Sequence, residues 1–326
     1  MESAVPPEIP PVPAEPSARA GVPRFDPPNI LWYFGAISAT AAANTVVGRT
    51  GAEHRGLWIF LVALAFLAGA AALCAFVLRL GYWIPAGVLA ASAVALVPAL
   101  VVGFEHLIGV WPRQPETTNP FSGFEGFVFA PAAATVAAGL VAFWLVPFGF
   151  VLLPVTVAAA LGIQFLVPAL VSHPSFGDHM VTLLITGAAF VVIGMLLDAR
   201  LHRSAAFWWH VVGLFAIGNG LVYYVGVNPL LPGDHSALWA WVAMLVIGAA
   251  LVVAAFPVGR ATWAVFGVAG VYAPALHYID DASGAWRTPL LAVFVGLALM
   301  VAGAILDRVG PSWPHRLARP ALRPRT

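Results

Sequence analysis

The residues of this chain that could do chemistry include a recurring pair, an acidic residue near a histidine. A carboxylate beside an imidazole can bind a divalent metal ion or relay protons near neutral pH. These groups are Glu53 with His54, Glu105 with His106, Asp178 with His179, Asp234 with His235, and His277 near Asp280. The alternative role is structural, because an acid at the N-terminus of a helix caps backbone N–H groups and favours the helix dipole. The sequence favours capping over a metal or proton site, and both remain open.

A second set of polar residues falls inside apolar segments, where an unpaired polar group is costly in hydrocarbon. These residues are Gln164, Asn219, Asn44 and His210. Gln164 and Asn219 occupy equivalent positions of the repeat described below, so both are expected on one interior face. Two explanations stay open: hydrogen bonds that join adjacent helices, which we favour, and a polar path for a small solute.

Two other kinds of residue are expected to be structural. Asp198 ends its apolar segment close to Arg200, so an ion pair at the membrane surface is expected there. Tryptophans, Trp209 and Trp263 among them, lie near segment ends as interfacial anchors do, and no chemistry is expected of them.

Motifs of several enzyme classes are missing from the chain. There is no G-x-S-x-G elbow, no H-E-x-x-H, no Walker-type loop and no G-x-G-x-x-G after a strand. The lone cysteine, Cys74, excludes a disulfide within the chain and a cysteine-based metal site. No cofactor is therefore expected, and an enzyme is disfavoured.

The elements that must position these residues are membrane helices. Of the 326 residues 61% are hydrophobic and 9% are charged, whereas soluble chains carry about 25% charged residues. Leu57 to Leu78 has no charge over 22 residues, more than the ~20 residues a helix needs to span a bilayer. Membrane lipid is therefore the expected surrounding. The net charge of +1 excludes the basic surface that nucleic-acid binding requires.

An internal repeat organises the apolar segments. Four glycines follow one another at intervals of 55, 54 and 55 residues: Gly139, Gly194, Gly248 and Gly303. Gly69 marks an earlier copy, displaced by a longer loop. A second marker follows 18 or 19 residues after the first in four copies, as Gly87, Ala158, Gly213 and Gly267.

Two near-identical strings support this register. They are residues 187–198 (GAAFVVIGMLLD) and residues 296–307 (GLALMVAGAILD). Phe34-Gly35 matches Phe266-Gly267 and extends the repeat back to the weakly apolar segment 30–48. That segment is therefore predicted to be a spanning helix.

The predicted fold is an all-α polytopic transmembrane bundle of about ten helices, built from five parallel two-helix repeats. The predicted spans are 30–48 and 57–78, 82–110 and 124–146, 149–171 and 180–199, 206–227 and 237–258, 261–279 and 288–307. This transmembrane domain occupies residues 29–308. It is preceded by a disordered tail, residues 1–28 with nine prolines, and followed by an Arg-rich tail, residues 309–326.

Arginine placement predicts the orientation, because cytoplasmic loops retain positive charge. Eleven of the fifteen arginines fall on the side of both termini, so both tails are expected in the cytoplasm. The Pro-rich head is expected to be a plain tether, with a cytoplasmic binding partner as the alternative. The sequence sets no oligomeric state.

One stretch, Leu196 to Gly213 (LLDARLHRSAAFWWHVVG), resembles multi-pass bacterial inner-membrane proteins whose domains have no known function. The resemblance covers about a twentieth of the chain. It implies a bacterial inner-membrane location and no reaction.

Three functions follow as hypotheses. The first is transport or permeation of a small solute or ion, which requires Gln164 and Asn219 to face a cavity open to water. The second is a structural or assembly protein, which requires such residues to bond helices together. The third is a membrane enzyme, which requires the outer acid and histidine side chains to share a pocket.

Overall fold

The computed structural model describes residues 27–53, 56–110, 125–171, 174–200, 203–225 and 237–282. Within these ranges every regular element is a helix, and no strand occurs. The elements are α1 (Pro27–Glu53), α2 (Leu57–Arg79), α3 (Trp83–Leu107), α4 (Glu125–Leu145), η1 (Gly149–Val151), α5 (Leu152–Gln164), α6 (Val167–Leu170), α7 (Phe176–Ala199), α8 (Arg203–Tyr224), α9 (Leu238–Val258) and α10 (Ala261–Ala282).

Seven helices are long and apolar enough to cross a membrane: α1 to α4 and α7 to α9. Two shorter apolar stretches, Gly149–Gln164 and Ala261–Ala275, lie in η1 with α5 and in α10. Large apolar side chains remain on the outside, such as Trp144 and Leu170 at 82% and 83% exposure. Such a surface suits hydrocarbon, and seven helices of this length and composition are compatible with a multi-pass membrane protein.

The helices fall in the first nine predicted spans. Helix α1 begins at Pro27 and so includes the last two residues of the predicted Pro-rich tail, because proline is tolerated in a first helical turn. The predicted span 149–171 is interrupted, because a turn at residues 165–166 separates α5 from α6. The tenth predicted span, 288–307, lies outside the described residues, as does the tail 309–326.

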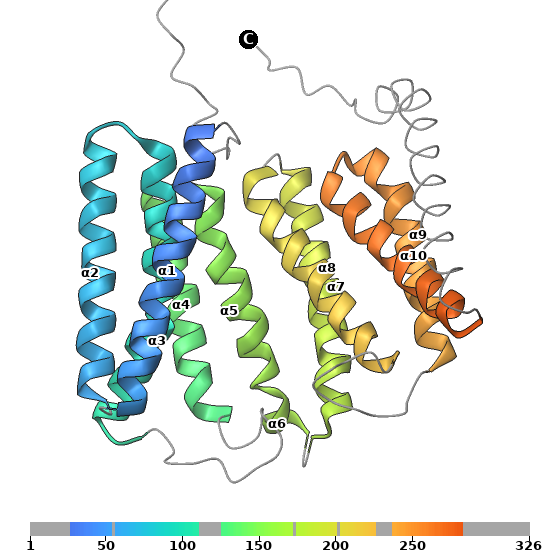
Figure 1. The fold of residues 1–326 in the computed structure, drawn as a ribbon, viewed down its shortest axis with the longest axis horizontal. Coiled ribbons are helices and arrows are strands. Elements are labelled where there is room, and N and C mark those ends of the chain that lie inside the picture. The colour runs from blue at the N-terminus through green and yellow to red at the C-terminus, as the bar shows by residue number, and fades with distance from the viewer. Residues whose placement is uncertain are drawn as a thin grey trace, which may run out of the picture.

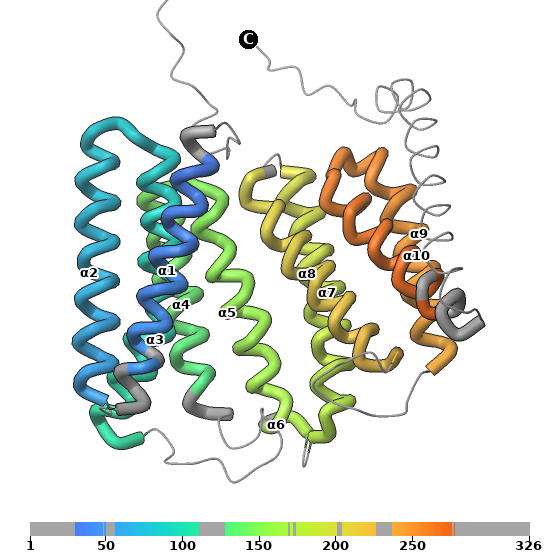
Figure 2. The backbone as a smooth tube through the Cα atoms, viewed as in Figure 1, coloured from blue at the N-terminus to red at the C-terminus, as the bar shows by residue number. Residues whose placement is uncertain are grey.

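Successive long helices alternate in direction and form a row, with α2 at one end and α9 and α10 at the other (Figure 1). The three most extensive helix contacts join α2 to α3, α7 to α8, and α9 to α10. Helix α4 packs on both α3 and α5, and α1 packs on α2 and α3 (Figure 2). The most extensive contacts therefore join the second helix of one predicted unit to the first helix of the next.

Glycines allow the paired helices to approach closely. A Cβ atom added to Gly187 of α7 would lie 2.5 Å from the carbonyl oxygen of Gly213 in α8. A Cβ atom added to Gly248 of α9 would lie 2.8 Å from the carbonyl oxygen of Gly267 in α10. Both distances are too short for a side chain, so these pairs need glycine. Close backbone contact through small residues is the usual packing of membrane helices.

Candidate functional site: a buried polar network

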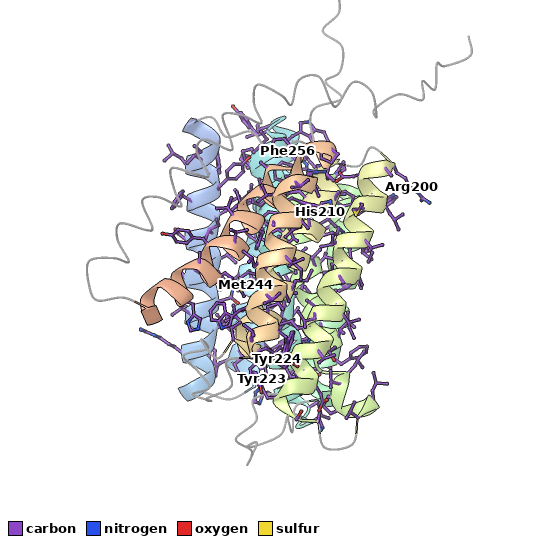
Figure 3. All side chains as sticks on the ribbon, turned by 90° about the vertical axis from the view of Figure 1, so that its right-hand side faces the viewer. Arg200, His210, Tyr223, Tyr224, Met244 and Phe256 are labelled. Carbon is purple, nitrogen blue, oxygen red and sulfur yellow. The ribbon has the colours of Figure 1, made fainter. Side chains whose placement is uncertain are left out.

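Four polar side chains from α7, α8 and the start of α10 form one network. Asp198 lies in the last turn of α7, His210 in α8, Arg260 just before α10, and Trp263 in the first turn of α10. Figure 3 shows His210 toward the end of the bundle that carries Arg200, away from Tyr223 and Tyr224. The four residues are brought together from positions up to 65 apart in the sequence.

Asp198 is the centre of the network. Arg260 donates from Nε to Asp198 Oδ2 at 3.0 Å and from its Nη2 to Asp198 Oδ1. His210 Nε2 lies 2.9 Å from the same Oδ2 atom. The two charged side chains are only 18% and 14% exposed. Because guanidinium and carboxylate match in a two-pronged geometry, this pair holds α7 firmly to α10.

Hydrogen bonding determines the protonation state of His210. Trp263 Nε1 lies 3.1 Å from His210 Nδ1, and an indole N–H can only donate. Nδ1 must therefore accept, so the proton of the neutral ring is on Nε2, which donates to Asp198. A second proton on Nδ1 would face the indole N–H, and the network thus selects the neutral imidazole.

His210 is fully buried, with 0% exposure. A Cβ atom added to Gly194 of α7 would lie 2.8 to 3.0 Å from three atoms of the imidazole ring. The absence of a side chain at Gly194 therefore makes the space that the ring occupies. The Trp263 ring meets the imidazole edge to face, with centroids 5.4 Å apart.

The turn between α9 and α10 positions Arg260. Gly259 ends α9 with a left-handed φ of 65°, and its N–H donates to the carbonyl groups of Ala255 and Phe256. The N–H of Arg260 donates to Ala255 as well. This pattern is a Schellman motif, which reverses the chain sharply because glycine tolerates the left-handed conformation. Arg260 and Trp263 are consequently held at the same end of the bundle as Asp198.

Both nitrogens of His210 are engaged within the network, which leaves no lone pair directed at a ligand. In the part of the chain that the structure describes, no group of three or more His, Cys, Asp or Glu residues could hold a metal ion. The arrangement can join three helices and neutralise a buried carboxylate.

The acid and histidine pairs have different environments. Asp178 forms a capping box with Ser175: its carboxylate accepts from the Ser175 N–H and hydroxyl at 2.7 Å each, and its own N–H donates back to the hydroxyl. The capping prediction is confirmed at this pair. Neighbouring His179 is fully buried. The carboxylate of Asp178 and the imidazole of His179 therefore lie in different environments.

Glu105 contradicts the capping prediction. It lies near the C-terminal end of α3, which ends at Leu107, so it is at the wrong end of a helix for a cap. Its side chain is buried, and its Oε2 atom has no hydrogen-bond partner among the described residues. His106 follows it in the same turn.

The remaining pairs are described only in part. Glu53 is the last residue of α1 and so is also at a C-terminal end. The ring of His277 stacks on Trp241, with centroids 4.1 Å apart. His54, Asp234 and His235 lie outside the described residues, as does the side chain of Asp280.

Gln164 and Asn219 do not share an interior face, so that prediction is wrong. Gln164 is buried at the end of α5. In the amide orientation that satisfies both of its polar atoms, it donates to the carbonyl of His179 at 3.0 Å and accepts from the N–H of Leu183 at 3.2 Å. Gln164 therefore ties α5 to the backbone of α7.

Asn219 is exposed and donates to the carbonyl of Phe215 in its own helix at 2.8 Å. The next residue, Gly220, is the one that faces α7, since a Cβ atom there would lie 2.7 Å from Leu184. Asn44 is likewise exposed and donates to the carbonyl of Thr40 at 2.9 Å. Of the four predicted intramembrane residues, only Gln164 and His210 bond to another helix within the part of the chain that the structure describes.

Of the four network residues, only His210 was singled out from the sequence as a candidate site residue, and the roles of Asp198, Arg260 and Trp263 were missed. Asp198 pairs with Arg260, 62 residues away, and not with nearby Arg200 as predicted. Trp263 is a hydrogen-bond donor and not only an interfacial anchor. Trp209, at the corresponding position of the predicted repeat, instead packs edge to face on Phe190. The recurrence of tryptophan at one position of the predicted repeat was the available signal, but it did not reveal which tryptophan has a polar partner.

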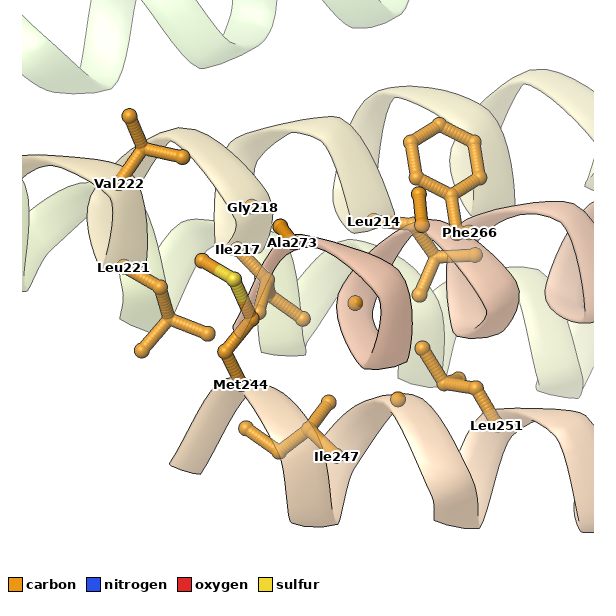
Figure 4. Close-up of a pocket in the computed structure, with 13 residues that line it drawn as sticks. Leu214, Ile217, Gly218, Leu221, Val222, Met244, Ile247, Leu251, Phe266 and Ala273 are labelled. Carbon is orange, nitrogen blue, oxygen red and sulfur yellow. The ribbon is translucent and has the colours of Figure 1, made fainter. Parts of the chain in front are cut away.

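An apolar pocket of about 210 Å³ lies between α8, α9 and α10 (Figure 4). Leu214, Leu221, Met244, Leu251 and Phe266 are among the residues that line it. Leu214 also packs with Trp263 in one apolar cluster, so the pocket begins where the polar network ends. The side chains that line the pocket are all apolar, so they offer a polar solute no side-chain hydrogen bond.

The candidate site is thus the network of Asp198, His210, Arg260 and Trp263 at one end of the bundle. Comparison with protein-family models, with curated proteins and with solved structures found no match for this chain.

Proposed function

We propose that this chain is a structural, assembly-type membrane protein, in which intramembrane polar residues join helices and do not conduct a solute. The observation that carries the proposal is the bonding of Asp198 to both His210 and Arg260, which links α7, α8 and α10. The bonds of Gln164 to the α7 backbone support the same role between α5 and α7. Such bonds replace water in hydrocarbon and stabilise a packed bundle.

Transport of a small solute or ion is the competing hypothesis. This hypothesis requires Gln164 and Asn219 to share one polar interior face. Gln164 is instead buried against α7, and Asn219 is exposed. The pocket between α8, α9 and α10 is apolar, which suits hydrocarbon better than a polar solute. A membrane enzyme with an outward acid and histidine site has less support, because the Asp178 carboxylate is used in a helix cap.

The proposal includes the full architecture: ten helices in five parallel two-helix repeats, in a bacterial inner membrane, with both termini in the cytoplasm. The alternating helix directions support this orientation, because Arg79, Arg200 and Arg260 then lie at the end where α1 begins (Figure 1). The polar network is accordingly on the cytoplasmic side. The Pro-rich head serves there as a tether, with a binding partner as the alternative.

Reconstituted liposomes test the proposal against transport. Wild-type protein, Asp198→Asn, Gln164→Leu and the control Asn219→Leu are each incorporated, and solute-driven swelling and proton leak are recorded. We expect rates equal to those of protein-free liposomes for all four. In detergent, Asp198→Asn and Gln164→Leu lower the unfolding temperature, whereas Asn219→Leu leaves it nearly unchanged, because Asn219 bonds only to its own helix. A saturable flux that Asp198→Asn or Gln164→Leu abolishes would overturn the proposal.

A further inference from the structure

His210 is the residue of the polar network whose charge can change near neutral pH. An imidazole gains or loses a proton between about pH 5 and pH 8, whereas a guanidinium keeps its charge throughout this range. In the described arrangement the charges of Asp198 and Arg260 cancel, and the neutral ring of His210 accepts from Trp263. The network therefore carries no net charge as long as His210 holds a single proton.

We propose that His210 is a proton-operated latch between the helix pairs α7–α8 and α9–α10. The neutral ring holds Trp263, and this is the closed arrangement of the two pairs. A second proton, on Nδ1, removes the bond to Trp263, and the α9–α10 pair swings away from α8 about the ion pair of Arg260 with Asp198. The latch rests on the helix-joining role proposed above and adds regulation by pH to it.

The closed arrangement has no place for a second proton on the ring. Nδ1 of His210 lies 3.1 Å from Nε1 of Trp263, so a proton on Nδ1 would put two N–H groups against each other, and both can only donate. The ring cannot turn away, because Nε2 is held 2.9 Å from Oδ2 of Asp198 and the ring fills the space beside Gly194. Protonation and the bond to Trp263 therefore exclude each other.

Charge acts in the same direction as hydrogen bonding. A protonated His210 would give the network a net positive charge, since Arg260 already neutralises Asp198 and donates to the same Oδ2 atom. His210 has 0% exposure, and an uncompensated charge away from water is costly. Separation of α10 from α8 admits water to the ring. Because the closed arrangement accepts only the neutral ring, acid shifts the equilibrium toward the open one.

No other charge nearby can take the place of Asp198. Among the described elements packed on α8, η1, α5 and α9 contain no charged residue and no histidine. The remaining acidic residues and histidines of these elements are Asp178 and His179 in the first turn of α7, and His277, Asp280 and Asp281 near the end of α10. All of them lie at the opposite end of the bundle. Arg200 and Arg203, at the near end, are cations and would only add to the repulsion.

The two helix pairs can separate without unpacking either pair. Helices α9 and α10 contact each other extensively, and each contacts α8 much less. The apolar pocket of about 210 Å³ lies along this seam, with Leu214 of α8 and Phe266 of α10 in its lining (Figure 4). Arg260 follows Gly259 in the turn between α9 and α10, so the pivot is at the end of the moving pair. The swing consequently breaks few contacts besides the bond to Trp263.

Distances between spin labels test the latch in full-length protein in lipid nanodiscs. In a Cys74→Ser background, labels are attached to Asn219→Cys in α8 and Val246→Cys in α9, since both positions are exposed. Pulsed electron resonance records the distance distribution from about pH 8 to about pH 5. We expect a second, longer distance to gain population in acid, with an open-to-closed ratio that rises by at most about tenfold per pH unit, as for one proton.

A matched label pair and two variants serve as controls. Ile185→Cys with Asn219→Cys measures α7 against α8 from exposed positions, and its distance should stay constant. His210→Gln keeps one donor for Asp198 and one acceptor for Trp263 in a side chain that takes up no proton. It should therefore keep the closed distance at every pH. His210→Asn replaces it if its distance at about pH 8 differs from that of wild type. Asp198→Asn breaks the network and gives the open reference.

The outcomes separate the latch from the helix-joining role. An acid-induced longer distance in wild type that the His210 amide variant lacks supports the latch. If wild type does not change with pH while Asp198→Asn is open, the latch is wrong and the joining role stands. If Asp198→Asn also keeps the closed distance, the network does not join the helices, and both proposals fail. If the amide variant opens in acid as wild type does, another group responds to pH and the latch is overturned.

Discussion

The helix pairs α7–α8 and α9–α10 share the same glycine spacing but pack in different registers. Gly194 and Gly213 are 19 residues apart, as are Gly248 and Gly267. In α9–α10 the two glycines meet, since a Cβ atom added to Gly267 would lie 2.7 Å from the carbonyl of Gly248. In α7–α8 they do not meet.

The difference comes from one side chain. His210 is in α8 at the position of Ala264 in α10, and its ring fills the space beside Gly194. The glycine that brings the α7 backbone close to Gly213 of α8 is therefore Gly187, two turns before Gly194. The same glycine position thus makes room for a backbone in one pair and for a buried imidazole in the other.

Asp198→Asn is expected to have the largest effect on the contact that distinguishes the α7–α8 pair. The substitution leaves the Arg260 guanidinium without its carboxylate in a mostly buried site, which should cost about 3 to 5 kcal/mol of the free energy of unfolding. Reversible unfolding in mixed detergent micelles measures it. The double variant Asp198→Asn with Arg260→Gln should recover part of the loss, because no unpaired charge remains. If the unfolding free energies lost in Asp198→Asn and in Arg260→Gln simply add in the double variant, the two side chains do not depend on each other.

Alanine at the two marker glycines is expected to have the next largest effect. Gly248→Ala meets main-chain atoms of α10 at 2.8 Å, and overpacking of this kind costs about 1 to 3 kcal/mol. For Gly194→Ala the three nearest atoms all belong to the His210 ring, so His210→Ala should relieve the overpacking, with a coupling of about 0.5 to 3 kcal/mol in a double-mutant cycle. The matched cycle of Gly248→Ala with Ala264→Gly should show none. Similar coupling in both cycles would contradict the different registers.

A smaller effect is expected from Trp263→Phe. Removal of the indole N–H leaves Nδ1 of His210 without its donor, at a cost of about 1 kcal/mol in the unfolding free energy. Trp209→Phe is the matched control, since Trp209 lies at the corresponding position of α8, one residue before His210, and contacts the apolar Phe190. Ultraviolet-excited tryptophan fluorescence can follow unfolding of both variants. Equal costs would mean that the hydrogen bond to His210 contributes nothing.

The smallest effect is expected at the N-terminal ends of α7 and α9. Helix α7 has the capping box of Ser175 and Asp178, whereas Ala237 before α9 makes no side-chain cap. Asp178→Ala should cost about 0.5 to 1 kcal/mol, and Ala237→Ser should add a similar amount to the free energy of unfolding. Urea unfolding in micelles can compare them. An unchanged stability for both would argue that these ends fray before the bundle unfolds.

The fold class and the helical segments followed from local properties of the sequence. Length, hydropathy and the near absence of charge predict helices that cross a membrane, because backbone groups in hydrocarbon must bond within their own segment. The glycine repeat also located residues that now lie at close contacts, such as Gly248 and Gly267. The cap at Asp178 was predictable because Ser175 precedes it by three residues.

Only the tertiary structure decided which helices pair and which polar atoms meet. Asp198 bonds Arg260 and not Arg200, and Asn219 turns away from the interior while Gln164 faces α7. These outcomes depend on how each helix is rotated about its axis against its neighbours, which is a property of several segments packed together. Local periodicity determines that a helix forms and which residues share its faces, but the choice of partner for each face is made by the packed bundle.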